Sequence, residues 1–190
     1  MAKKNIIVLT GVPGTGKTKT ASVLAESGFA VVDLNLLAKS CGLFGDFDSQ
    51  DQSHEVNLKA LEKVLRAILP ILESRNVVVE GHLGCEIKVR GAIAVVLRCN
   101  PDVIGQRLLP RGYAKAKIAK NAMAEMLDYC TIQSQKNYGK VFEFDTTSST
   151  PEEISIKIMR TLEGKKVKKQ EKIDWSKKLL DVDVRTLVEA

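Results

Sequence analysis

The fold of this 190-residue chain is decided by residues 11–18, GVPGTGKT. They match the pattern GxxxxGK[ST], and they lie directly after the apolar run 5–9 and directly before the run 18–27. The first run predicts a buried strand, and the second predicts an amphipathic helix that ends at Gly28. A glycine-rich turn between a strand and a helix is the context in which this pattern forms a phosphate-binding loop, or P-loop.

Each P-loop residue has an expected role toward a nucleoside triphosphate. Gly11, Gly14 and Gly16 let the backbone wrap closely around phosphate oxygens, and the helix that follows adds a favourable dipole. Lys17 is expected to neutralise the β- and γ-phosphates, and the Thr18 hydroxyl to bind Mg²⁺. The sequence therefore predicts ATP and Mg²⁺ as cofactors. The alternative is a glycine-rich turn with a surface lysine.

The remaining apolar patterns predict an α/β fold. Further strands are expected at 29–32, 76–79, 92–97 and 141–144, and helices at 34–39, 56–73, 101–109, 115–135 and 151–162, with a mobile loop at 40–53. Pro70 is expected to bend or shorten the helix that contains it. Because the strands are continuously apolar and alternate with helices, we expect a five-stranded parallel sheet with helices on both faces.

Two residues after the 76–79 strand are candidates for the same site. Glu80 ends that strand, and its carboxylate is expected to approach Mg²⁺ directly or through water. His82 is a candidate for orienting a water molecule or a phosphate. The alternatives are a solvated acid at the end of a strand and an ordinary loop histidine.

Composition and charge limit the class of protein. The chain is 44% hydrophobic and 27% charged, and no apolar run approaches the ~20 residues that cross a bilayer, so we expect a soluble protein without a membrane partner. The four cysteines form no CxxC pair, which favours reduced thiols in the cytoplasm. Residues 160–178 hold eight basic and three acidic residues of a chain with net charge +6, which predicts a partner-binding tail. The alternative is a tail that packs Trp175 and Leu179-Leu180 back onto the domain.

Several ordered blocks resemble the small adenylate kinases called adenylate kinase isoenzyme six, found in archaea and in eukaryotic nuclei. The blocks are LTGVPGTGKT, VVDLNLLAK, VVVEGH, VVLRCNP and QRLLPRGYAKAKIAKNAMAE, between Ile6 and Glu163. The resemblance implies a P-loop nucleoside monophosphate kinase domain over 1–163 and a basic C-terminal extension over 164–190. Within the domain it implies a small lobe for the monophosphate at about 34–57 and a short lid at about 110–120.

The resemblance also implies the site residues. ATP contacts are expected from Gly14, Gly16, Lys17, Thr18, Lys19 and the lid residue Arg111, with Arg107 as a second arginine. The alternative for Arg107 is an exposed arginine on a helix surface. Asp33, Asn35 and Lys39 are candidates for contacting the acceptor nucleotide, and the alternative is that they are only solvated. Lys39 stands where relatives can have arginine, and lysine offers a point charge in place of a two-pronged contact.

Two functions follow from the resemblance. The first is adenylate kinase activity, in which ATP and AMP (or another nucleoside monophosphate) give two diphosphates, with ATPase activity as a side reaction. The second is an ATP-hydrolysing factor for assembly of the small ribosomal subunit, with a ribosomal protein or rRNA as partner and a nuclear location in a eukaryote. A kinase for another small metabolite is a third possibility, because P-loop kinases share the donor site and differ in the acceptor lobe.

Overall fold

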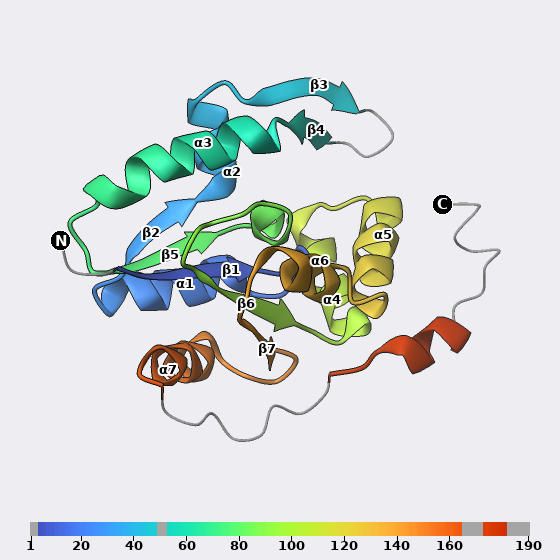
Figure 1. The fold of residues 1–190 in the computed structure, drawn as a ribbon. Coiled ribbons are helices and arrows are strands. Elements are labelled where there is room, and N and C mark those ends of the chain that lie inside the picture. The colour runs from blue at the N-terminus through green and yellow to red at the C-terminus, as the bar shows by residue number, and fades with distance from the viewer. Residues whose placement is uncertain (1–3, 49–52, 165–172, 182–190) are drawn as a thin grey trace.

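A five-stranded parallel sheet with strand order β2-β5-β1-β6-β7 forms the centre of the computed structural model (Figure 1). The structure describes residues 4–48, 53–164 and 173–181. The strands of the sheet are β1 (Asn5–Thr10), β2 (Ala30–Asp33), β5 (Asn76–Glu80), β6 (Ile93–Arg98) and β7 (Val141–Asp145). The expected fold class is confirmed, and each strand agrees with its apolar run to within one residue at either end.

Helices cover both faces of the sheet. They are α1 (Lys17–Glu26), α2 (Leu34–Ser40), α3 (Leu58–Ile68), α4 (Pro101–Leu108), α5 (Lys115–Met126), α6 (Tyr129–Asn137) and α7 (Pro151–Leu162). Short 3₁₀ turns are η1 (Leu69–Ile71), η2 (His82–Cys85), η3 (Leu109–Arg111) and η4 (Ser176–Asp181). No helix among the described residues is both long and apolar enough to cross a membrane.

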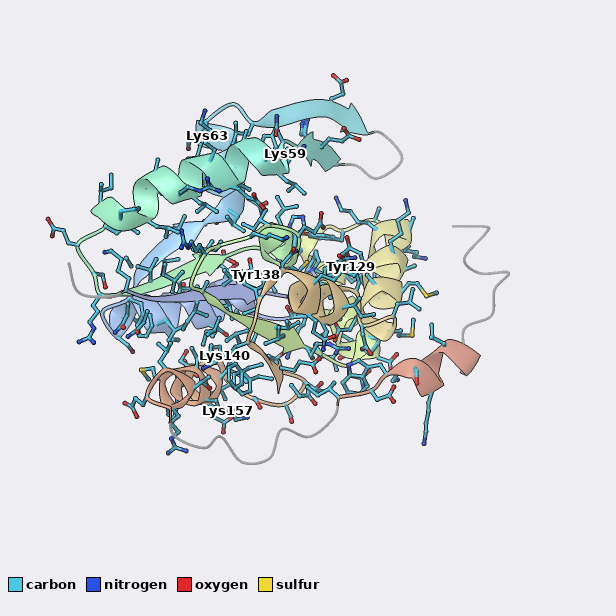
Figure 2. The ribbon with its side chains drawn as sticks, viewed as in Figure 1. Lys59, Lys63, Tyr129, Tyr138, Lys140 and Lys157 are labelled. Carbon is cyan, nitrogen blue, oxygen red and sulfur yellow. The ribbon has the colours of Figure 1, made fainter. Side chains whose placement is uncertain are left out.

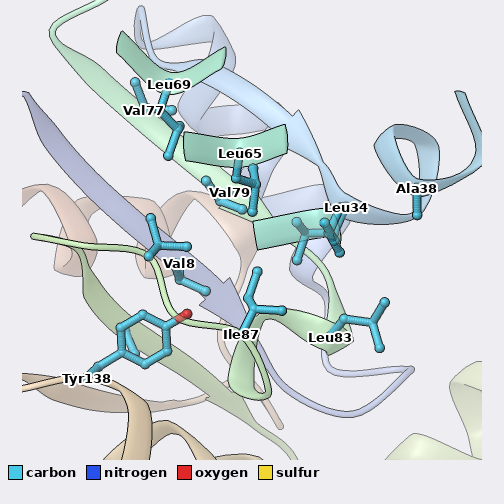
Figure 3. Packing of buried hydrophobic residues seen from close by; sticks show 13 residues of the cluster. Val8, Leu34, Ala38, Leu65, Leu69, Val77, Val79, Leu83, Ile87 and Tyr138 are labelled. Atoms are coloured by element: carbon cyan, nitrogen blue, oxygen red, sulfur yellow. The ribbon is translucent and has the colours of Figure 1, made fainter. Parts of the chain in front are cut away.

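The side chains of β1 alternate between two cores, one on each face of the sheet. Ile7 and Leu9 are fully buried with α1 and α7, which pack against each other. Val8 points to the opposite face, where it joins residues of α2, α3 and Tyr138 (Figure 3). Because both faces are buried, the central strands are continuously apolar, which is the pattern that predicted a parallel sheet.

The helix expected over 115–135 is two helices. Asp128 lies between α5 and α6 with a φ of 54°, the left-handed region, and this conformation ends the first helix. Its carboxylate pairs with Arg98, which is fully buried at the end of β6. An ion pair with a residue 30 positions away therefore holds the backbone conformation that the local sequence does not predict.

Arg98 joins four elements at this point. Its guanidinium also donates to Glu125 Oε1 of α5 at 2.7 Å and to Glu143 Oε1 of β7 at 2.5 Å. Burial by itself lowers the pKa of Arg98, but the surrounding carboxylates outweigh that effect and raise it. A buried cation with this many partners fixes the relative positions of β6, β7, α5 and α6.

The prediction of a mobile loop at 40–53 was wrong, because described residues of this segment belong to a β-hairpin. Residues Phe44–Asp48 form β3 and Ser53–Val56 form β4, and the two strands are antiparallel. The Phe44 and His54 rings stack with centroids 5.4 Å apart, a cross-strand contact that stabilises such a pair. Residues 49–52 of the expected loop lie outside the described residues.

The helix expected at 56–73 is shorter at both ends. Asn57 caps the start of α3, since its side chain accepts from the Ala60 N–H at 3.0 Å. The chain tightens into η1 at Leu69, next to Pro70, which confirms that this proline shortens the helix.

Part of the C-terminal segment packs on the domain. Residues of η4 contact α5, and Lys178 forms an ion pair with Asp102 of α4. The indole nitrogen of Trp175 is buried and lies beside the Glu125 side chain. The basic residues at 165–172 lie outside the described residues.

Candidate active site

A cleft of about 1080 Å³ lies at the carboxyl ends of β1, β2 and β5. In an open parallel sheet this edge is where ligands bind. All but one of the candidate site residues line the cleft: Gly14, Gly16, Lys17, Thr18, Lys19, Asp33, Asn35, Glu80, His82, Arg107 and Arg111. The exception among the candidates is Lys39, an exposed residue of α2 that is not part of this lining.

Glycine is required in the P-loop for two different physical reasons. A Cβ on Gly11 would lie only 2.4 Å from the Leu97 carbonyl oxygen, so the loop can pass this close to β6 only without a side chain. Gly16 has open space around it, but its φ is 91°, which side-chain-bearing residues rarely adopt. Gly16 caps α1, so this backbone conformation aims the first turn of the helix at the cleft.

The Lys17 ammonium group bridges the two ends of the loop. Its Nζ donates to the Gly11 carbonyl at 2.9 Å and to the Val12 carbonyl at 3.0 Å. Burial lowers the pKa of Lys17, while the negative charge of Glu80 is among the effects that oppose the shift. A phosphate in the cleft would supply an anionic partner for this half-buried cation, which is the role expected of a P-loop lysine.

Thr18 and Glu80 present two oxygen atoms side by side. The Thr18 hydroxyl donates to Glu80 Oε1 at 3.3 Å, and the Glu80 side chain is buried. Burial, together with the nearby Asp33 carboxylate, raises the pKa of Glu80. A nearby cation would stabilise the ionised form of a carboxylate held in this way. The pair therefore fits Mg²⁺, which takes few protein ligands and completes its coordination shell with phosphate oxygens and water. No group of three or more His, Cys, Asp or Glu side chains suited to a metal exists in the described part of the chain.

His82 begins the η2 turn and its side chain is exposed within the cleft. Desolvation by the cleft walls and the positive charges of Lys17 and Lys117 lower the pKa of His82. Because the ring is exposed to solvent, the charges of Lys17 and Lys117 explain the lowered pKa better than desolvation does. At neutral pH the imidazole is therefore neutral, and one ring nitrogen can accept a proton from water.

Arg111 projects from the segment after α4 and faces the cleft. Its guanidinium carbon lies 5.6 Å from the centre of the Tyr113 ring, and Lys117 Nζ lies 5.9 Å from the same ring. The aromatic face therefore gathers two cations at the edge of the cleft. Lys117, Lys120 and Asn121 of α5 also line the cleft, and sequence analysis did not single them out. Their spacing on one helix directly after Arg111-Gly112-Tyr113 was the available signal.

Arg107 is not an exposed arginine on a helix surface. Its guanidinium donates to the Gly14 carbonyl of the P-loop at 3.2 Å and to the Thr146 carbonyl after β7 at 2.7 Å. It therefore joins the P-loop to the segment that follows the last strand, at one end of the cleft. Thr146 adds a second link, since its hydroxyl donates to the Thr15 carbonyl at 3.0 Å.

Asp33 and Asn35 lie on the other side of the P-loop, at the start of α2. Asp33 caps that helix, since its Oδ1 accepts from the Asn35 N–H at 2.8 Å and the Leu36 N–H at 3.0 Å. Asp33 is the register partner of Glu80 in the neighbouring strand, which explains how its charge affects the Glu80 carboxyl. This side of the cleft is therefore acidic and polar, whereas the α5 side is basic.

Comparison with known proteins adds sequence evidence to this geometry. The family described as "AAA domain" matches residues 7–128. A protein of Methanocaldococcus jannaschii named "Putative adenylate kinase" is 34% identical over 176 residues, 92% of this chain and 95% of that protein. A protein of the same name from Pyrococcus abyssi is 37% identical over 174 residues, 90% of this chain and 91% of that protein.

A solved structure shares the fold. Shikimate kinase from Acinetobacter baumannii in complex with shikimate superposes with a TM-score of 0.62 and 19% identity, over 87% of this chain and 96% of that chain. Both sequence matches agree with the resemblance found in the ordered motif blocks. The chain belongs to the family of these archaeal "Putative adenylate kinase" proteins and contains an AAA domain.

Proposed function

We propose that this chain is a nucleoside monophosphate kinase, and specifically an adenylate kinase that transfers the γ-phosphoryl group of ATP to AMP. The observation that carries the proposal is the arrangement of one cleft: the P-loop with Lys17 at its floor, Arg111 and Lys117 on one side, and Asp33 and Asn35 on the other. The names of the archaeal relatives support the same reaction. AMP provides a phosphate oxygen that is already anionic, so no protein nucleophile is required.

Each side chain has a defined task in this reaction. Lys17 neutralises the β- and γ-phosphates, and Arg111 closes over the group in transfer. Thr18 and Glu80 would hold Mg²⁺, which neutralises charge on the phosphates when it is bound. Arg107 holds the P-loop against the end of β7 and lies where it can contact ATP. The residues about 34–57 serve as the acceptor lobe and 110–120 as the lid, with Lys39 a candidate contact within the lobe.

The test is the dependence of ATP consumption on AMP. We expect AMP to accelerate ATP loss and to give two ADP for each ATP consumed, and a nonhydrolysable bisubstrate spanning ATP and AMP to bind in the cleft and inhibit. ATP loss that is slow and independent of AMP would contradict the kinase proposal. Other monophosphates in place of AMP measure the preference of the acceptor lobe.

ATP hydrolysis is a second candidate, and His82 is the observation that favours it. Its imidazole is exposed in the cleft two residues beyond Glu80, where it can orient a water molecule. Water must be positioned and relieved of a proton, whereas the AMP phosphate arrives charged. Substituting both Glu80 and His82 by Ala should therefore lower hydrolysis more than transfer, because the loss of a Mg²⁺ ligand affects both reactions and the loss of His82 affects hydrolysis alone. Equal losses in both reactions would assign the pair to Mg²⁺ or to the fold.

Hydrolysis by this chain would fit the ribosome assembly role that the family resemblance implies, with a ribosomal protein or rRNA as the partner. The basic C-terminal segment is the candidate contact.

A further inference from the structure

The backbone of the turn that carries His82 accepts hydrogen bonds from side chains that do not line the cleft. Within the turn, the Gly84 N–H donates to the Gly81 carbonyl at 3.1 Å. The His82 carbonyl accepts from the Thr10 hydroxyl at 3.1 Å and from the Cys85 thiol at 3.2 Å. These bonds fix the backbone of His82 while its side chain remains exposed in the cleft.

Two further donors reach this turn from the end of α6. The Asn137 amide Nδ2 donates to the Cys85 carbonyl at 2.8 Å, and the Tyr138 hydroxyl donates to the Gly84 carbonyl at 2.7 Å. Asn137 and Tyr138 are 52 and 54 residues from their partners in the chain, and neither lines the cleft. Figure 3 shows the Tyr138 ring in the core, with its hydroxyl directed toward the segment that carries Ile87.

The Tyr138 bond is buried and has no ready substitute. Burial raises the pKa of Tyr138, so the hydroxyl remains a donor under all ordinary conditions. The turn is pressed against β1, since a Cβ on Gly84 would lie 2.7 Å from Val8 Cγ1. The Gly84 carbonyl cannot turn toward water while the turn keeps this position, so removing the hydroxyl leaves a buried acceptor unpaired unless the turn moves.

We infer that Asn137 and Tyr138 are positioning residues for His82, and that they set the hydrolytic activity of the site without touching the nucleotide. The inference rests on the proposed function, in which His82 orients water for hydrolysis. Without the two donors the turn can shift away from β1 and carry the imidazole with it. Hydrolysis depends on where that imidazole lies, whereas transfer to AMP depends on the P-loop, Arg111 and the acceptor lobe.

Tyr138→Phe and Asn137→Ala test the inference, because each removes the donor without adding a charge. We expect kcat for ATP hydrolysis to fall by about fivefold to tenfold, KM for ATP to remain unchanged, and transfer to AMP to stay within about twofold of wild type. In a His82→Ala background, the same substitutions should cause no additional loss of hydrolysis.

Two variants serve as controls. Thr161→Val removes a hydroxyl from α7, one that donates to the carbonyl of Lys157 at 2.9 Å (Figure 2). Ile158→Val removes a buried methylene from α7, on the other face of the sheet, and controls for a general loss of stability. Neither should change the ratio of hydrolysis to transfer.

Three outcomes would overturn the inference: equal losses of hydrolysis and transfer in Tyr138→Phe, further loss of hydrolysis in the His82→Ala background, or an unchanged ratio in both donor variants. Failure of the proposed function gives a different result. In that case the wild-type protein neither transfers phosphate to AMP nor hydrolyses ATP, or His82→Ala leaves hydrolysis intact.

Discussion

Glu80 accepts a hydrogen bond from Thr18 at 3.3 Å, although the two residues are 62 positions apart in the chain. They meet because Glu80 ends β5 and Thr18 is the last residue of the P-loop after β1, and these two strands are neighbours in the sheet. A parallel sheet brings the carboxyl ends of its strands to one edge, so a carboxylate from one strand reaches the loop that follows another.

Glu80→Gln tests this pair as the Mg²⁺ site. The amide keeps the size of the side chain and removes the negative charge, so we expect the Mg²⁺ concentration for half-maximal activity to rise by about tenfold. Activity titrated against Mg²⁺ at saturating ATP gives that value. Glu26→Gln, an exposed change on α1, is the matched control. An identical Mg²⁺ requirement in Glu80→Gln and wild type would remove Glu80 from the metal site.

Lys17→Ala is expected to abolish phosphoryl transfer. Removing a preorganised charge from the transferring phosphates costs on the order of 10²- to 10³-fold in kcat. The measurement is ADP formation from ATP and AMP, with circular dichroism to verify folding. Lys63→Ala, an exposed change on α3, should retain wild-type turnover. Near-normal turnover in Lys17→Ala would mean that the P-loop is not the catalytic centre.

Arg111→Ala should lower kcat more than it weakens ATP binding. The side chain is exposed and rests over Tyr113 at 5.6 Å, so its main contribution is expected when the lid closes over the group in transfer. We expect kcat to fall by at least tenfold while Kd for ATP changes by less than about threefold. Steady-state kinetics and equilibrium titration with ATP separate the two quantities. An unchanged kcat would place Arg111 outside the active site.

The pKa of His82 should depend on the positive charges of Lys17 and Lys117. Because its pKa is lowered in the folded state, the unfolded chain binds a proton at higher pH than the native protein does. The contribution of His82 to stability is therefore fully present above about pH 6.5 and declines as the pH falls below that value. NMR titration of the imidazole, assigned with His82→Ala, should give a pKa below the usual value. Lys117→Met should raise that pKa, and no rise would exclude Lys117 as a cause.

Deleting residues 165–190 distinguishes a partner-binding tail from a structural one. The packing of η4 on α5, the buried Trp175 indole nitrogen and the Lys178–Asp102 pair predict that the deletion lowers Tm by several degrees. If the lysines also bind RNA, the deletion weakens RNA affinity, and the affinity of the full chain falls steeply with salt. Trp175→Ala should reproduce the stability loss without the affinity loss. Unchanged RNA affinity after deletion would leave the tail with a structural role alone.

Much of the fold was predictable because its signals are local. The helix expected at 151–162 has those bounds, with Thr150 and Glu153 forming reciprocal capping bonds and Pro151 at the first position. The P-loop was predictable for the same reason, since its glycines, lysine and threonine are contiguous in the sequence. The edge of the sheet then placed Glu80 and His82 beside it.

The features that sequence analysis missed depend on distant partners. Asp128 ends α5 through its ion pair with Arg98, and nothing near Asp128 in the sequence indicates that contact. The hydrogen bonds that Arg107 donates to Gly14 and Thr146 were not predicted, because these acceptors are far away along the chain. The β3–β4 hairpin was interpreted as a loop because glycine and aspartate residues obscured its short strand pattern.

The break at Asp128 has a mechanical consequence. α5 follows the Arg111 segment and lines the cleft, whereas α6 ends in the two donors that hold the His82 turn. One continuous helix would transmit every tilt of the lid to that turn. Because the helix is interrupted at Asp128, and both Asp128 and Glu125 of α5 are tied to Arg98, the C-terminal end of α5 is anchored to the sheet before α6 begins. In the proposed kinase, a lid closing over the donor nucleotide would then leave the alignment of the histidine undisturbed.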